Sequence, residues 1–153
     1  MSIDSTMPVL SVSITDVAVH KEVNSFRSVT ADDWQSFRDL RLKALKDAPK
    51  AYGIAAEDVE GTPDEEWKKL CQEAFEGAGK WYFVAHHNGK LIGMLGATEV
   101  FGKHMRHQVE ICHAFVDEAF RGHGVMKRLF LALKERLQRV EHLEQMIVWV
   151  TLH

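Results

Sequence analysis

The sequence has few cysteines, no long hydrophobic run and no early basic residues, and each shortage excludes a class of protein. Two cysteines, Cys71 and Cys112, are too few for a disulfide framework, and neither belongs to a C-x-x-C pair. We interpret both as small buried hydrophobic residues rather than as ligands or nucleophiles. No apolar run approaches the ~20 residues that span a membrane, and no Lys or Arg precedes Lys21, which argues against a secretory signal. A cytoplasmic location is therefore expected.

The chain also lacks an excess of charge of either sign. It carries 19 Lys and Arg against 22 Asp and Glu, a net charge of −3 with neutral histidines. Such a balance creates no overall field that would hold nucleic acid or an anionic membrane, so neither is predicted as a partner. The nine histidines follow no zinc-binding spacing, so no metal site is predicted. With 153 residues, 46% of them hydrophobic, the chain suits a single domain with one core.

Hydrophobic periodicity predicts the element order β-α-α-β-β-β-α-β. The expected strands are 23–29, 80–86, 90–100, 108–116 and 145–152, and the expected helices are 32–48, 63–77 and 122–139. Residues 1–22 suit either an extra strand or a loose leader, and 49–61 suit a long irregular connection. Asn88-Gly89 predicts a tight hairpin. A right-handed final crossover would make 108–116 and 146–152 parallel, so the sheet should be mixed.

Sequence signals also mark where the helices start and stop. Thr30 with Asp33 predicts a capped start for the first helix, and Thr62-Pro63 with Glu65 predicts a capped start for the second. Pro49 should stop the first helix, and the second should end near Gly77 and Gly79.

The most informative stretch is Arg121-Gly122-His123-Gly124, between the end of a predicted strand and the start of a basic helix. Glycines at a strand–helix turn allow an anion to approach the unpaired N–H groups of the first helical turn. The stretch taken alone fits equally a turn that merely needs glycine, with its basic residues in solvent. A dinucleotide fingerprint fails because Lys127 stands at the third glycine position, and no Walker motif occurs.

In its context this stretch resembles the acetyl-coenzyme A signature Q/R-x-x-G-x-G/A of the GCN5-related N-acetyltransferase (GNAT) family. Arg121, Gly124 and Met126 occupy the signature positions, and "VDEAFRGHGV" is similar to the family's V-D-P-x-x-R-G-x-G. The resemblance covers about residues 26–152. It implies an α/β (α+β) fold, with a mixed, mostly antiparallel sheet that contains a splayed parallel pair and is flanked by helices.

The resemblance also implies a set of residues that bind acetyl-CoA as co-substrate. The pantetheine arm would lie along the end of the fourth strand, and the pyrophosphate would lie against the glycine turn. The implied residues are Phe115, Val116, Arg121, Gly122, His123, Gly124, Val125, Met126 and Lys127. Met126 departs from the signature, because a small residue usually stands there, and it would crowd the pyrophosphate.

An acceptor amine must lose a proton before it attacks, and the resemblance implies that a general base on the fourth strand removes it. The position most often used in the family falls on Gln108, which has no basic group. Glu110 lies two residues on, on the same strand face, and is our candidate catalytic residue. His113 should face the other side and be a buried, hydrogen-bonded histidine.

The function implied is transfer of an acetyl group from acetyl-CoA to a primary amine of a small molecule or peptide, by direct attack. The alternative is a catalytically impaired CoA-binding or regulatory module; a basic helix 122–139 that contacts RNA or protein is a weaker third. Family members continue after the fifth strand with another helix and strands. We therefore expect a GNAT-like domain over 23–153, truncated there, whose exposed strand 146–152 pairs with a second copy or another partner.

Overall fold

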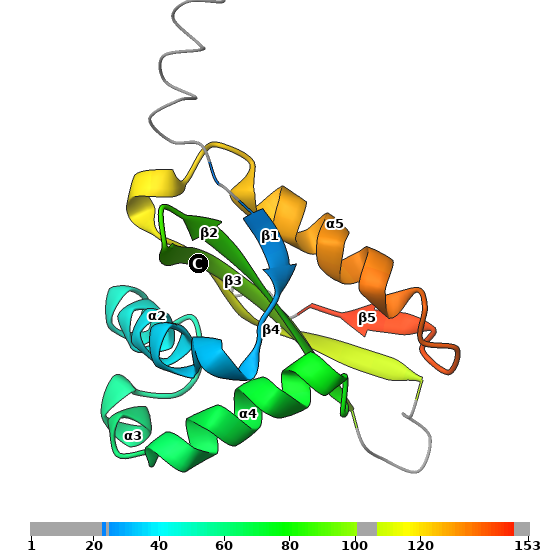
Figure 1. Cartoon of the computed structure of the whole chain (residues 1–153), viewed down its shortest axis with the longest axis horizontal. Helices are drawn as coiled ribbons and strands as arrows, with labels where there is room; N and C mark the ends of the chain where they lie inside the picture. Colours follow the sequence, from blue (N-terminus) through cyan, green and yellow to red (C-terminus); the bar gives the residue numbers. More distant parts are fainter. Residues whose placement is uncertain (1–22, 24, 101–106, 149–153) are drawn as a thin grey trace, which may run out of the picture.

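A five-stranded mixed sheet forms the centre of the protein (Figure 1). The computed structural model describes residue 23, residues 25–100 and residues 107–148. The strands, in spatial order, are β1 (Ser25–Ser28), β2 (Lys80–His87), β3 (Lys90–Glu99), β4 (Gln108–Val116) and β5 (Gln145–Ile147). The first three pairings are antiparallel, and β4 pairs with β5 in parallel. The predicted mixed sheet and its parallel pair are therefore confirmed.

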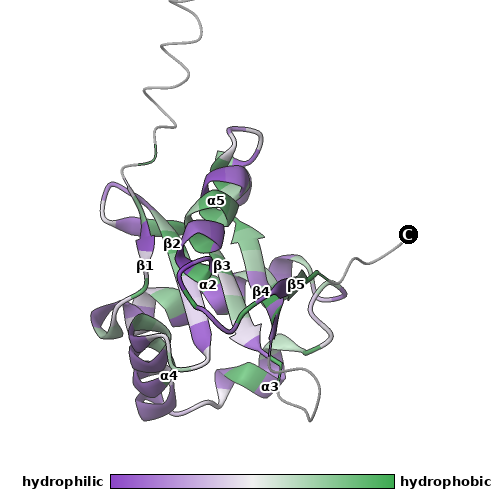
Figure 2. Ribbon diagram, turned by 90° about the vertical axis from the view of Figure 1, so that its right-hand side faces the viewer, coloured by the Kyte–Doolittle hydropathy of each residue, from purple (hydrophilic) through white to green (hydrophobic). Residues whose placement is uncertain are grey.

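Helices cover both faces of this sheet (Figure 1). The helices α2 (Trp34–Asp47), α3 (Ala56–Glu60) and α4 (Asp64–Glu76) lie on one side, and α5 (Val125–Leu137) lies on the other. Two 3₁₀ turns, η1 (Ala31–Asp33) and η2 (Glu118–Phe120), precede α2 and α5. Figure 2 shows hydrophobic colour along the central strands, whereas α4 is mainly hydrophilic on the side turned to the viewer. This is the distribution expected of surface helices that bury one stripe.

Each side of the sheet has its own hydrophobic cluster, because alternate strand residues point to opposite faces. The cluster on the α2 side includes Phe37, Leu40, Trp67, Cys71, Tyr82, Val84, Met94 and Phe115. The cluster on the α5 side includes Trp81, Ile92, Leu95, Val109, Val116, Leu129 and Leu133. Cys71 is fully buried, as predicted, whereas Cys112 is only partly buried.

The predicted start of the first helix is correct. The Thr30 N–H donates to Asp33 at 2.7 Å, which forms the carboxylate half of the capping box. Arg27 holds both oxygens of the same carboxylate, at 2.7 and 2.9 Å, so strand β1 is tied to the helix start. The first turn is 3₁₀, and α-helical geometry begins at Trp34.

Apart from small shifts at the ends of elements, the helices differ from the sequence prediction in three ways. The connection 49–61 contains the short helix α3, whose N-cap Ala55 makes no side-chain capping bond and therefore left no signal. Thr62 is not the cap of α4, because Pro63 takes that place and α4 begins at Asp64. The last helix begins at Val125 rather than near residue 122, because Gly122 and Gly124 have φ of 79° and 78°, outside helical geometry. The leader 1–22 lies outside the described residues.

Packing around Tyr82 gives a test of the fold. A methyl group on Gly96 would lie 2.6 Å from the Tyr82 ring, which stacks on Phe37 at 5.5 Å and is fixed. Gly96→Ala should therefore lower the free energy of unfolding by about 1–3 kcal/mol. Urea denaturation measures it, with Gly61→Ala as the control, because φ is ordinary there and no atom lies within 4 Å. Equal stability of the two variants would contradict the packing described.

Candidate active site

The glycine turn and the first turn of α5 enclose a small cavity, which we call the Gly-turn cavity. Its volume is about 150 Å³. The lining residues are Val116, Phe120, Arg121, Gly122, Gly124, Val125, Met126 and Lys127. Seven of the nine residues predicted to bind CoA, Val116 at the end of β4 among them, thus line this cavity. Phe115 lies beneath Arg121, and His123 is exposed at the turn; neither lines the cavity.

The geometry of this turn suits an anion. Gly124 is the N-cap of α5 and has φ of 78°, and no side chain caps the helix. The N–H groups of the first turn therefore keep their bonding capacity and their partial positive charge. A β-carbon added at Gly122 or Gly124 would meet no atom within 4 Å, so the space beside the backbone is open. Arg121 and Lys127 add formal positive charge at the same place.

Arg121 also fastens the turn to the strand that precedes it. Its Nε donates to the Val116 carbonyl at 2.8 Å, and its guanidinium lies 5.5 Å from the centre of the Phe115 ring. No described residue accepts a hydrogen bond from its Nη groups. These donors remain for an anion in the Gly-turn cavity.

Asp117 follows directly after β4 and is the buried charged residue of the described chain, at 7% exposure. Its carboxylate accepts from Lys43 Nζ at 2.6 Å and from the Ala119 N–H at 3.1 Å. Burial opposes the charge, but these donors outweigh it and hold the pKa of Asp117 below its usual value. Helix α2 is thereby fixed to the segment that leads into the glycine turn.

A larger cavity of about 380 Å³ lies along β4 on the α2 side, and we call it the β4 cavity. It is lined by Arg41, Ala51, Tyr52, Glu110, Ile111, Cys112, His113, Ala114 and Val148. Glu110, the predicted base, is half-buried there. It is paired with Ile147 in the last rung that joins β4 to β5. Gln108, by contrast, donates to Gln145 at 2.6 Å and is bound to the neighbouring strand.

A bulge in β4 shapes this cavity. Between Met94 and Gly96 the register advances two residues on β3, while β4 advances three, from Phe115 to Cys112. His113 takes up part of the extra length with φ of 54°, a conformation that few residues other than glycine adopt. The His113 ring contacts Phe37 and Tyr82, on the α2 side. The predicted orientation of His113 is therefore wrong, because the bulge interrupts strand alternation.

The ionisation of the cavity residues limits the chemistry available to them. Burial lowers the pKa of His113 to about 3, and its Nδ1 has no hydrogen-bond partner, so it is a neutral ring and not the hydrogen-bonded one expected. Burial also raises the pKa of the Cys112 thiol, which disfavours the thiolate that a nucleophile needs. Tyr52 donates to the Ala114 carbonyl at 2.7 Å. Glu110 is thus the carboxylate on the described wall of the cavity.

Comparisons with known proteins identify the family. A profile described as the Acetyltransferase (GNAT) family matches residues 34–153. The chain belongs to the GNAT acetyltransferase family. No individually curated protein is similar enough in sequence to count as a relative.

Solved structures similar to this GNAT domain have low sequence identity and a shared fold. A GNAT-family acetyltransferase from Streptococcus pneumoniae superposes with a TM-score of 0.69 at 17% identity, over 81% of this chain and 72% of the other. A predicted acetyltransferase from Clostridium acetobutylicum, solved with acetyl-CoA, gives 0.61 at 13% identity, over 83% and 80%. The PaiA N-acetyltransferase from Thermoplasma acidophilum, in complex with coenzyme A, gives 0.63 at 14%, over 82% and 78%.

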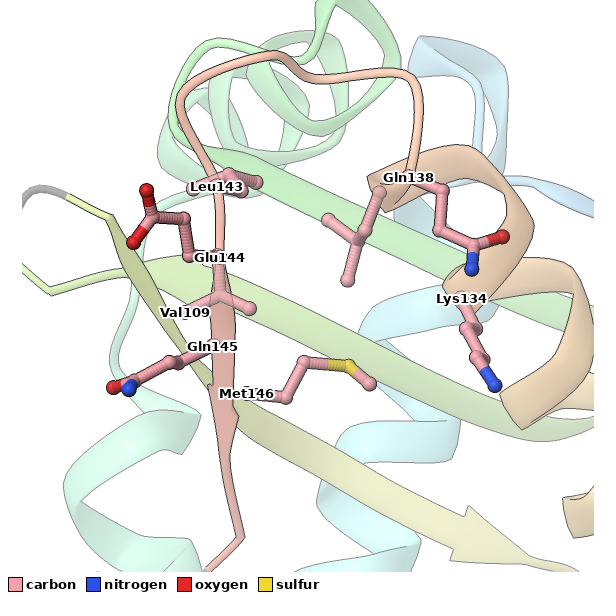
Figure 3. A pocket seen from close by; sticks show the side chains of 8 residues that line it. Val109, Lys134, Gln138, Leu143, Glu144, Gln145 and Met146 are labelled. Atoms are coloured by element: carbon pink, nitrogen blue, oxygen red, sulfur yellow. The ribbon is translucent and has the colours of Figure 1, made fainter.

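A third hollow lies away from these two cavities, between the end of α5 and β5 (Figure 3). Its volume is about 210 Å³, and Val109, Leu137, Leu143 and Met146 give it an apolar lining. Figure 3 shows Met146 extending across it toward Lys134. Met146 and Val148 are 37% and 56% exposed. Pairing of strand 146–152 with a second copy stays a prediction, since 149–152 lie outside the described residues.

Two residues of the β4 cavity, Arg41 and Tyr52, were not predicted from the sequence. A signal for Arg41 was present: it stands four residues from both Phe37 and Leu45, which are buried, so a cation interrupts the apolar stripe of a helix. Tyr52 comes from the long connection and had no periodic pattern to mark it.

Among the described residues no helix has the length and apolarity needed to cross a membrane. Nor do three metal-ligating side chains gather anywhere in the described part.

The ion pair between Asp117 and Lys43 predicts how stability depends on pH. The pKa of Asp117 is lower in the folded protein than in the unfolded chain. The charged carboxylate therefore stabilises the fold above the unfolded pKa of about 3.9, and this stabilisation is lost as pH falls through the lower folded pKa. Asp117→Asn should lower the free energy of unfolding at pH 7 by about 1–2 kcal/mol, since Lys43 is partly exposed.

Denaturation of both proteins between pH 7 and pH 2 measures this effect. The difference between wild type and Asp117→Asn should shrink below about pH 4. The control Asp39→Asn removes an exposed carboxylate from α2, the helix that carries Lys43, and should change the free energy of unfolding little. A difference for Asp117→Asn that stays constant to pH 2 would exclude the charge as its cause.

Proposed function

We propose that the protein is an acetyl-CoA-dependent N-acetyltransferase that acts on a primary amine of a small molecule or peptide. The observation that carries the proposal is the Gly-turn cavity, an open, positively charged helix start without a side-chain cap, at the end of the strand that also lines the β4 cavity. Acetyl-CoA, when bound, supplies an activated acetyl group. One strand would thus serve both partners of the reaction.

The residues present fit a diphosphate at the Gly-turn cavity. The first-turn N–H groups, the Nη groups of Arg121 and the Lys127 ammonium would hold it. Main-chain groups around Phe115 and Val116 would hold the pantetheine arm as an added strand. Arg121 occupies the Val116 carbonyl at present, so it would have to release that bond or share the acceptor. Met126 fills part of the lining and would restrict the phosphate position.

Glu110 would then remove the proton from the acceptor amine. An alkylammonium has a pKa near ~10, so at neutral pH most acceptor molecules lack the lone pair needed for attack. Glu110 faces the β4 cavity without an ion pair to any described residue, which leaves its carboxylate available. Burial raises the pKa of Cys112 and makes it poorly suited to carry the acetyl group, which favours direct transfer to the amine as the proposed route.

The alternative is a GNAT-like module that binds CoA without turnover. Gln108 at the family's usual base position and Met126 in the signature favour it. Both functions need the Gly-turn cavity, and only the first needs Glu110. The two tests below therefore separate them.

The first test concerns binding of the cofactor. Gly124→Trp places a large side chain in the open space at the turn and should weaken acetyl-CoA binding at least tenfold in calorimetry. Gly89→Trp is the matched control, because Gly89 has the same φ of 78° and equally open surroundings but lines neither cavity. It should bind acetyl-CoA as the wild type does. Equal binding by all three proteins would overturn the proposed cofactor site.

The second test concerns the base. Glu110→Gln should lower amine-dependent release of CoA, chiefly below about pH 8, and the loss should shrink as pH approaches the pKa of the amine. Acetyl-CoA affinity should not change. Glu66→Gln, on the exposed surface of α4, serves as control. If Glu110→Gln retains the wild-type pH profile, Glu110 is not the base, and absence of turnover in the wild type would favour the binding module.

A further inference from the structure

Arg41 differs from the other cations of helix α2 in having no partner for its charge. Arg38 lies 3.1 Å from Asp39, Lys43 lies 2.6 Å from Asp117, and Lys46 lies 3.1 Å from Glu60.

No described carboxylate lies within ion-pair distance of Arg41. Its guanidinium sits 4.9 Å from the centre of the Tyr52 ring, and its Nη1 is shielded from solvent without a hydrogen-bond partner.

Such an arrangement is unfavourable unless something binds there. A guanidinium withdrawn from water with an unsatisfied donor carries a desolvation cost. The groups nearest to it in the cavity wall, Tyr52, Cys112 and His113, are neutral: burial raises the first two pKa values and lowers the third. An anion in the β4 cavity would satisfy the guanidinium, and a carboxylate matches its planar pair of donors.

The same cavity carries one negative wall residue among those described, Glu110. A ligand that complements both charges has an amino group for Glu110 and a carboxylate for Arg41. The volume of about 380 Å³ lies within the ~300–1,000 Å³ usual for small-molecule sites. Tyr52, whose hydroxyl is bound to Ala114, offers a ring face beside the guanidinium.

We propose that the acceptor is an amine that also carries a carboxylate, of the size of an amino acid, and that Arg41 binds this carboxylate. This inference rests on the proposed function and names the substrate class of that site. It makes Arg41 the residue that determines specificity for the acceptor.

The test uses the full chain, acetyl-CoA and a panel of amino acids, each paired with its carboxamide. Release of CoA gives kcat/KM for every acceptor with wild type and with Arg41→Gln. Comparing the two proteins on one acceptor cancels differences in the reactivity of the amines. Arg41→Gln should lower kcat/KM for carboxylated acceptors at least tenfold, mainly through KM. It should change kcat/KM for the carboxamides less than twofold.

Three controls exclude indirect effects. Arg41→Lys keeps the charge without the paired donors and should retain an intermediate activity. Arg38→Gln lies on the same helix but outside the cavity, so it should leave kcat/KM unchanged for both the carboxylates and the carboxamides. The melting temperature of Arg41→Gln should equal or exceed that of the wild type, because an unpaired charge is removed from a partly buried place.

Each other outcome counts against the inference. It is overturned if the carboxamides are acetylated and no carboxylated amine is, or if Arg41→Gln lowers kcat/KM equally for both acceptor forms. It is overturned also if replacing acetyl-CoA by succinyl-CoA reveals an Arg41-dependent preference, because the carboxylate would then belong to the acyl donor. Failure of the wild type to bind acetyl-CoA, or to acetylate any amine in the panel, would instead mark failure of the proposed function itself.

Discussion

One extra residue in β4 is the constraint on which both cavities depend. Before the bulge, Glu110 and Cys112 face the α2 side; after it, Phe115 faces that side and Val116 faces α5, although strict alternation would reverse them. The bulge therefore lets one strand line the β4 cavity first and then deliver its end to the start of α5. His113 bears the backbone cost of this arrangement, of the order of 1–3 kcal/mol for a non-glycine residue held at positive φ. The tight contacts of its ring with Phe37 and Tyr82 hold it there.

Helix α2 joins the two cavities mechanically. Lys43 reaches the Asp117 carboxylate at the end of β4, and Arg41, half a turn away, lines the β4 cavity. The connection after α2 adds the Tyr52 hydroxyl, which binds the Ala114 carbonyl just after the bulge. A displacement of α2 would therefore move the wall of the β4 cavity and the segment that leads into the glycine turn together.

The sequence predicted best where local chemistry decides the structure. Strand alternation, the Asn88-Gly89 turn and the Thr30–Asp33 cap each act within a few residues, and the elements they predict are present. The glycine turn was recognisable because its residues are consecutive. The orientation of His113 was not, since a bulge is set by the pairing of β4 with β3 and leaves no local pattern. Tyr52 is held at the site by its hydrogen bond to Ala114, 62 residues further along the chain, and no spacing rule predicts such a contact.

Departures from local consistency gather at the β4 cavity. Arg41 and His113 both line it, and each has a shielded nitrogen without a hydrogen-bond partner among the described residues. In a hydrophobic core such atoms would be replaced by apolar groups with little loss, so their presence requires another reason. His113 has one in the bulge, because its ring fills the space against Phe37 and Tyr82. Arg41 packs against the Tyr52 ring, but that contact supplies no anion for its charge, and its neighbours on α2 already make the ion pairs. A charge that the fold neither needs nor neutralises is best explained by a ligand that does.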